Sequence, residues 1–141
     1  MTQKLKTVLE EFKSIEDRDT RFDLLIETSD RFVGVPDSIS KRPYPKQNLV
    51  PACESEAYVF VEKLPNEKIK FYFAVENPQG ISAKAMAVIL DETLSGATAS
   101  EVSQISENIV LDLFGGAISM GKGQGLMSMV QMVKFLAQNQ S

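Results

Sequence analysis

The sequence of 141 residues contains no histidine and only one cysteine, Cys53. Histidine is the commonest general base and metal ligand, and it activates the nucleophile in Ser–His and Cys–His pairs. Its absence argues against these catalytic arrangements and, with a single cysteine, against an ordinary zinc site. Because one cysteine cannot form an internal disulfide, we expect a reducing compartment and predict a cytoplasmic protein.

The chain also lacks a long apolar run and an excess of basic residues. No segment is long enough to span a bilayer, and no apolar stretch follows the first six residues as in a secretory signal. The formal net charge is −4 and the isoelectric point is about 4.9. Nucleic acids and anionic membranes reward clustered Lys and Arg, so we predict neither as the main partner. The length and the 43% hydrophobic content are typical of one globular domain, spanning residues 1–141.

Apolar residues at spacings of three and four predict helices on both sides of a central β-rich region. The expected helices in the first half cover residues 5–12 and a segment that starts after Asp17 or Asp19 and buries Phe22, Leu25 and Ile26. Those in the second half cover residues 83–90, a short stretch after the capping box of Thr98 and Glu101, residues 108–114, and a last helix that starts near 121–124 and buries Leu126, Met129, Val130, Val133 and Ala137.

Two runs of β-forming residues, 57–61 and 69–75, predict a hairpin, and residues 48–50 form a candidate short edge strand. The order is therefore helix, helix, strands, then helices. Such segregation predicts an α+β fold with a small antiparallel sheet of about three strands, flanked by helices.

Cys53 follows an irregular stretch, residues 34–51, that is interrupted by prolines. A loop this long in a compact domain is usually functional or disordered, and the position before a strand can hold a side chain near the surface. A free cysteine can equally be a small buried hydrophobe. Glu54 and Glu56 add negative charge that opposes thiolate formation when carboxylates lie close. The residues alone leave the reactive and structural interpretations open.

The glycine-rich segment before the last helix has three interpretations. Gly116, Gly121, Lys122 and Gly123 approach the spacing of a phosphate-binding P-loop, but Gly123 stands where Ser or Thr holds magnesium. The segment lies too near the C-terminus for the parallel strands that such proteins need. It can instead be a flexible start of the helix with Lys122 solvated, or a helix N-terminus that favours an anion such as a thiolate or persulfide.

Residues 48–59 resemble the active loop of the SufE family, which are sulfur acceptors and activators of cysteine desulfurases. Asn48, Cys53 and Ser55 match the family pattern. Ala52 replaces the usual Gly, Glu56 the usual Gln and Tyr58 the usual Trp. Residues 83–98 resemble the family's central helix and turn, and residues 122–126 its segment before the last helix, with Lys122 in place of Arg.

This resemblance implies a single SufE-like domain that takes persulfide sulfur from a cysteine desulfurase onto Cys53, stimulates the desulfurase and relays the sulfur to an iron–sulfur scaffold protein. Pyridoxal phosphate then belongs to the partner, and this chain needs no cofactor or metal and is not a stand-alone enzyme. Cys53 is the carrier, supported by Ala52, Glu54, Ser55, Glu56, Lys122, Gln124 and Gly125. The alternatives are a non-catalytic regulatory module with an inert cysteine, a nucleotide-binding protein and an unrelated α+β domain.

Overall fold

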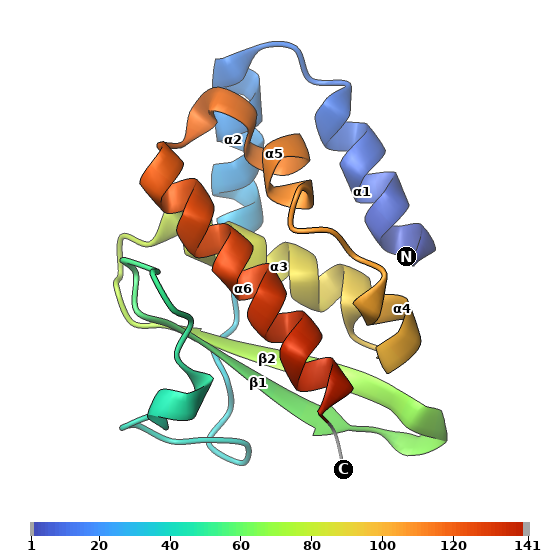
Figure 1. Ribbon diagram of the computed structural model, residues 1–141. Helices are drawn as coiled ribbons and strands as arrows, with labels where there is room; N and C mark the ends of the chain where they lie inside the picture. The colour runs from blue at the N-terminus through green and yellow to red at the C-terminus, as the bar shows by residue number, and fades with distance from the viewer. Residues whose placement is uncertain (1, 140–141) are drawn as a thin grey trace.

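The computed structural model describes residues 2–139, which form six α-helices and three β-strands (Figure 1). The helices are α1 (Gln3–Lys13), α2 (Arg18–Ser29), α3 (Ile81–Leu94), α4 (Ala99–Ser103), α5 (Ile109–Phe114) and α6 (Met120–Gln138). The strands are β1 (Ala57–Lys63), β2 (Lys68–Val75) and β3 (Ala97–Thr98). The predicted α+β fold and the order of its elements are confirmed. None of the helices within residues 2–139 is long and apolar enough to cross a membrane.

The sheet is antiparallel in the order β1-β2-β3. The predicted hairpin pairs β1 with β2 in a register that sets Ala57 opposite Val75. The third strand is not the expected one. Residues 48–50 contribute only an isolated bridge from Leu49 to Tyr58, and β3 pairs instead with the start of β2. A two-residue strand carries no periodic pattern, so only its pairing identifies it.

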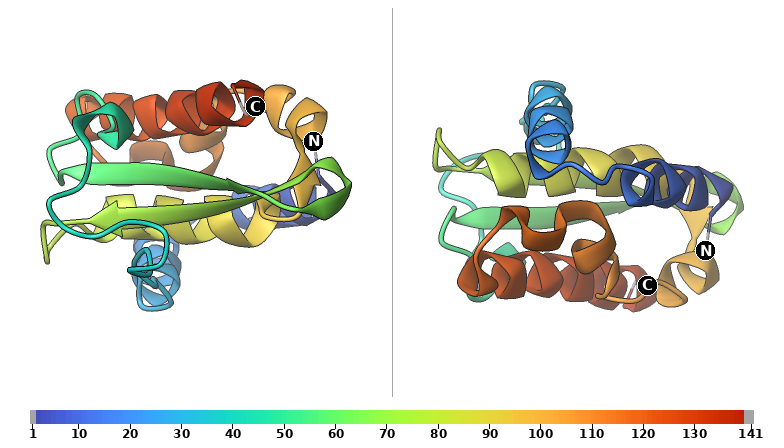
Figure 2. Two further views of the ribbon diagram at one scale, coloured as in Figure 1. Left: turned by 90° about the horizontal axis from the view of Figure 1, so that it is seen from below. Right: turned by 90° about the horizontal axis from the view of Figure 1, so that it is seen from above.

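The two faces of the sheet are covered differently. Side chains such as Val59, Phe71 and Phe73 point to the helices, where α3 packs over β2 and α6 over β1 (Figures 1 and 2). The opposite face carries Tyr58 and Phe60, and the irregular segment 34–51 covers it. The residues of this second cluster are Val35, Tyr58, Phe60 and Ala74, with Ile39, Tyr44, Leu49 and Tyr72 packed against them.

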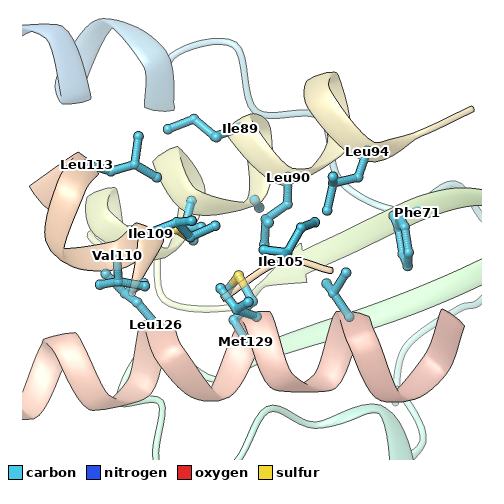
Figure 3. Close-up of a cluster of buried hydrophobic side chains, with 14 of the residues drawn as sticks. Phe71, Ile89, Leu90, Leu94, Ile105, Ile109, Val110, Leu113, Leu126 and Met129 are labelled. Atoms are coloured by element: carbon cyan, nitrogen blue, oxygen red, sulfur yellow. The ribbon is translucent and has the colours of Figure 1, made fainter. Parts of the chain in front are cut away.

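The main core lies between the sheet and the helices (Figure 3). Helix α3 runs through its centre, and nine of its 14 residues are buried, as predicted for a helix that is apolar nearly all round. The predicted apolar face of α6 is also confirmed, because Leu126, Met129, Val130, Val133 and Ala137 are all buried.

The helix ends follow local side-chain chemistry. Asp17 caps α2 by accepting a hydrogen bond from the backbone N–H of Thr20, and the predicted capping box of Thr98 and Glu101 opens α4. Helix α6 begins earlier than expected, at Met120, because the Ser119 hydroxyl caps it. Gly121, Gly123 and Gly125 therefore lie inside the first two turns of α6 and do not form a flexible lead-in, whereas Gly116 lies in a short 3-10 turn before the helix.

Arg21 of α2 joins the ends of two neighbouring helices. Its guanidinium donates hydrogen bonds to the carbonyls of Phe12 and Ile15 at the end of α1. It also donates to the carbonyls of Asp112 and Leu113 in α5. The last carbonyls of a helix lack partners within the helix, so one side chain satisfies the ends of two helices.

Candidate functional site

Cys53 lies in a tight loop, residues 51–56, whose base is closed by hydrogen bonds. The backbone N–H of Val50 donates to the carbonyl of Ala57 at 2.8 Å. The Asn48 side-chain amide donates to the carbonyl of Val59, also at 2.8 Å. Together these bonds join the segment before the loop to β1, so the cysteine projects from a fixed base at one end of the sheet.

The far side of the loop is tied to the end of β2. The carbonyls of Ser55 and Glu56 accept hydrogen bonds from the N–H groups of Asn77 and Glu76. Two residues of the loop have left-handed backbone conformations, Ala52 with φ 61° and Glu56 with φ 50°. Residues with a Cβ atom seldom adopt this region. The left-handed conformation at position 52 explains why the family pattern usually has a glycine where this chain has Ala52.

The loop is packed against two neighbouring segments through glycines. Gly125 of α6 is buried, and a Cβ atom there would lie 2.9 Å from the carbonyl oxygen of Ala52 and 3.2 Å from Cα of Cys53. Gly80, just before α3, has the same role toward Ser55, whose hydroxyl oxygen would lie 2.9 Å from an added Cβ. Only glycine permits these approaches, so the cysteine loop lies directly against α6 and the β2–α3 turn.

A cavity of about 290 Å³ opens beside Cys53, which is half-buried and packs against the main core. We call it the Cys53 pocket. In Figure 1 the loop before β1 and the turn after β2 lie at the same end of the sheet, beside the first half of α6. Six of the predicted site residues border the pocket: Ala52, Cys53, Glu54, Ser55, Lys122 and Gly125.

Two predicted residues lie elsewhere. Glu56 does not border the pocket, and its carboxylate accepts a hydrogen bond from the Tyr58 hydroxyl at 3.2 Å. Burial and this bond raise the pKa of Tyr58 above its ordinary value. Gln124 is exposed on α6 and does not border the pocket either.

Sequence reasoning missed several residues of the pocket, above all Phe22 and Ile81. Phe22 was expected on the buried face of α2, but its exposed fraction is 44%, and it stands at the pocket rim. Ile81, at the start of α3, is 38% exposed. Asn77, Gln79 and Gly80 belong to a turn recognised in the sequence only as the end of the sheet. No sequence signal joins these segments, because they meet only in the folded chain.

The pocket has simple electrostatics. Among residues 2–139, Lys122 and Glu54 are the only charged side chains that border it. Helix α3 starts at the pocket without a side-chain cap, and Ser82 and Ala83 of its first turn border the cavity. An uncapped helix N-terminus and an ammonium group both favour a negative charge nearby. Lys122 and the helix N-terminus thus favour an anionic sulfur at Cys53, whereas the carboxylate of Glu54 opposes it.

A second cavity, of about 340 Å³, lies between residues 31–36, β2 and α3. It contains no cysteine. Its charged side chains are paired with each other, Arg31 with Glu92 at 2.9 Å and Lys70 with Asp91 at 2.6 Å. It therefore offers no unpaired charge and no nucleophile, and the Cys53 pocket is the better candidate for chemistry.

The reactive side chains at the Cys53 pocket suit thiol chemistry. The described part of the chain has no group of three His, Cys, Asp or Glu side chains that could hold a metal ion. The only cysteine of the sequence borders the pocket, and Lys122 borders the same cavity. Such a site can form and break bonds between sulfur atoms when a second sulfur compound enters.

Comparison with known proteins gives one family and one fold. The sequence model of the family described as "SufE: Fe-S metabolism associated domain" matches residues 6–137. The solution structure of a hypothetical protein from Thermus thermophilus superimposes with a TM-score of 0.74 at 22% identity. The match covers 98% of this chain and 96% of that one, so the two proteins share a fold. No curated protein matches the chain.

Proposed function

Because the chain belongs to the SufE family of domains associated with Fe–S metabolism, we propose that it is a sulfur acceptor that acts with a cysteine desulfurase. Cys53 takes the sulfur, the desulfurase is stimulated, and the sulfur passes to a scaffold protein for cluster assembly. The observation that carries this proposal is the placement of the single cysteine on a braced loop beside a cavity. We also propose that the reaction takes place in the reducing cytoplasm, where the thiol persists.

The transfer balances without an external oxidant or reductant. The desulfurase uses its pyridoxal phosphate to form a persulfide on its own cysteine. The Cys53 thiolate attacks the outer sulfur of that persulfide, a new S–S bond forms, and the partner's cysteine leaves as a thiolate. A thiolate of the scaffold protein then attacks the outer sulfur on Cys53 in the same manner. This chain contributes the thiol, the cavity and the charge around it, and needs no cofactor of its own.

Lys122 is the group that we assign to the anionic sulfur. Its ammonium group is a point charge and lacks the planar, bidentate geometry of an arginine, so its effect is electrostatic. Lys122→Ala should slow sulfur transfer about two- to fivefold, the size expected for an exposed charge interaction. The folding stability should change little, because the side chain is exposed. Single-turnover transfer rates and urea unfolding measure the two effects, and an unchanged transfer rate would leave Lys122 a surface residue.

Cys53→Ser tests the carrier role against the main alternative, a regulatory module with an inert cysteine. The substitution changes one half-buried atom, so the fold should persist. We expect that the variant accepts no sulfur and does not remove the outer sulfur from the persulfide of the desulfurase. Cysteine turnover by the desulfurase, measured with and without each variant, gives the answer. Full stimulation by Cys53→Ser would favour the regulatory module and rule out the carrier.

A further inference from the structure

Glu56 is the last residue of the cysteine loop, yet its side chain bonds to Tyr58, which lies in the second cluster on the opposite face of the sheet. Its backbone N–H donates to the carbonyl of Cys53 at 3.3 Å, and its own carbonyl accepts from Glu76 at 3.1 Å. Its φ of 50° lies in the left-handed region, where a residue with a Cβ atom is strained. The position of the Cys53 backbone therefore depends on how firmly Glu56 is held in this conformation.

We propose that Tyr58 is a positioning residue for Cys53, which it holds through the hydrogen bond from its hydroxyl to the carboxylate of Glu56. This inference deepens the proposed function, on which its meaning for sulfur transfer depends. The donor and acceptor oxygens are 3.2 Å apart. This separation is long for a bond from a hydroxyl, so the bond is a modest restraint by itself. It adds a side-chain restraint to the two backbone bonds of Glu56.

Tyr58 is itself fixed by the irregular segment that covers this face. Its residue is only 8% exposed, and its ring centroid lies 5.1 Å from that of Tyr44. Arg42 stacks over the Tyr44 ring at 5.8 Å and pairs with Glu76 at 2.9 Å. Segment 34–51, Tyr58 and Glu56 thus form a continuous support beneath the loop. A tyrosine hydroxyl is protonated at neutral pH in any case, and burial raises the pKa of Tyr58 further, so the hydroxyl is available as a donor.

The same face of the sheet supplies a matched control. The Tyr72 hydroxyl donates to Glu62 at 2.8 Å, so the chain contains a second tyrosine–glutamate pair. Tyr72 stands opposite Phe60 in the hairpin, and Glu62 lies near the far end of β1, away from residues 51–56. Tyr72→Phe removes the same type of hydrogen bond without touching the cysteine loop. A general weakening of the sheet affects both variants, whereas loss of positioning affects only Tyr58→Phe.

The test is the rate at which iodoacetamide alkylates Cys53 in the isolated protein. Tyr58→Phe should raise this rate about two- to fivefold, the population shift expected from one lost, modest hydrogen bond that holds the loop over a half-buried thiol. Tyr72→Phe should react at the wild-type rate. A wild-type or slower rate in Tyr58→Phe would overturn the proposal, and so would an equal acceleration in both variants.

Substitutions at Glu56 keep the proposal testable even if Tyr58→Phe fails to fold. Glu56→Ala removes the acceptor from an exposed residue and should raise the alkylation rate as Tyr58→Phe does. Glu56→Gln keeps an acceptor oxygen but loses the negative charge, so its alkylation rate should lie between those of the wild type and Glu56→Ala. An equal rate for Gln and Ala would contradict the assigned hydrogen bond. Because no desulfurase is present, these results stand apart from the proposed function, which fails only if Cys53 takes no sulfur.

Discussion

Gly125 is the residue at which α6 meets the cysteine loop. An added methyl group would collide with backbone atoms of Ala52 and Cys53, which cannot rotate away as a long side chain can. Gly121, one turn earlier on the same helix, has no atom within 4 Å of an added Cβ. Glycine-to-alanine substitutions at these two positions therefore compare a crowded site with an open site on the same helix.

Gly125→Ala should displace the cysteine loop. Overpacking costs about 1–3 kcal/mol, and the higher helix propensity of alanine returns up to about 1 kcal/mol. We therefore expect a loss of about 1–2 kcal/mol in the free energy of unfolding, together with faster alkylation of Cys53. Urea unfolding and iodoacetamide labelling measure these effects. Gly121→Ala should leave labelling unchanged and keep or raise the stability; faster labelling in that variant would show that the effect belongs to α6 as a whole.

At the residue scale, resemblance to a family predicts more than composition does. The matched loop 48–59 identifies Cys53 and Ser55, the matched segment 122–126 identifies Gly125, and all three border one pocket. The resemblance does not reveal that Gly125 is required by the carbonyl of Ala52, because that contact joins residues 73 positions apart in sequence. The helical pattern assigned Phe22 to the core, because periodicity gives a face but not what covers it.

At the scale of elements, Arg21 holds the arrangement of α1, α2 and α5. Arg21→Ala would remove the side-chain donor shared by the ends of α1 and α5, although the carbonyl of Phe12 keeps its bond from the N–H of Ile15. We expect a loss of about 2–3 kcal/mol in the free energy of unfolding, the size measured for bonds to charged groups. Arg21→Lys should recover less than half of this loss in the free energy of unfolding, because one ammonium group cannot reach both helix ends.

The midpoint of urea unfolding tests this assignment. Arg18→Ala is the control, because Arg18 is an exposed arginine on the first turn of the same helix. Its removal should change the stability by no more than about 0.5 kcal/mol. Equal losses in the Arg18 and Arg21 variants would mean that the bonds to α1 and α5 contribute nothing beyond the charge.

Long periodic elements were predictable, and short ones were not. The hairpin and the buried faces of α3 and α6 follow from alternation and helical spacing, because each buries many side chains. The strand β3 has two residues and exists only through its pairing with β2. The start of α6 was expected near residues 121–124 and lies at Met120, a difference common at helix ends, because glycine has low helix propensity and marks the start poorly.

On the scale of the whole molecule, the Cys53 pocket is built from four separate parts of the chain. They are α2, the loop 51–56, the turn before α3 together with the first turn of that helix, and the first turns of α6. The sheet separates this pocket from the cluster formed by Tyr58 and segment 34–51. Such a site is invisible to local sequence patterns, and the expectation that its parts meet came from the family resemblance alone. The irregular segment, which sequence reasoning could not place, proves to be the cover of the second face.

The intact mass of the reduced protein, after incubation with a cysteine desulfurase, pyridoxal phosphate and L-cysteine, tests the central claim most directly. If Cys53 carries the sulfur, the protein should gain one sulfur atom that is lost on reduction and is absent from Cys53→Ser. The same gain in Cys53→Ser, or no gain in the native chain while the desulfurase turns over cysteine, would contradict the carrier role.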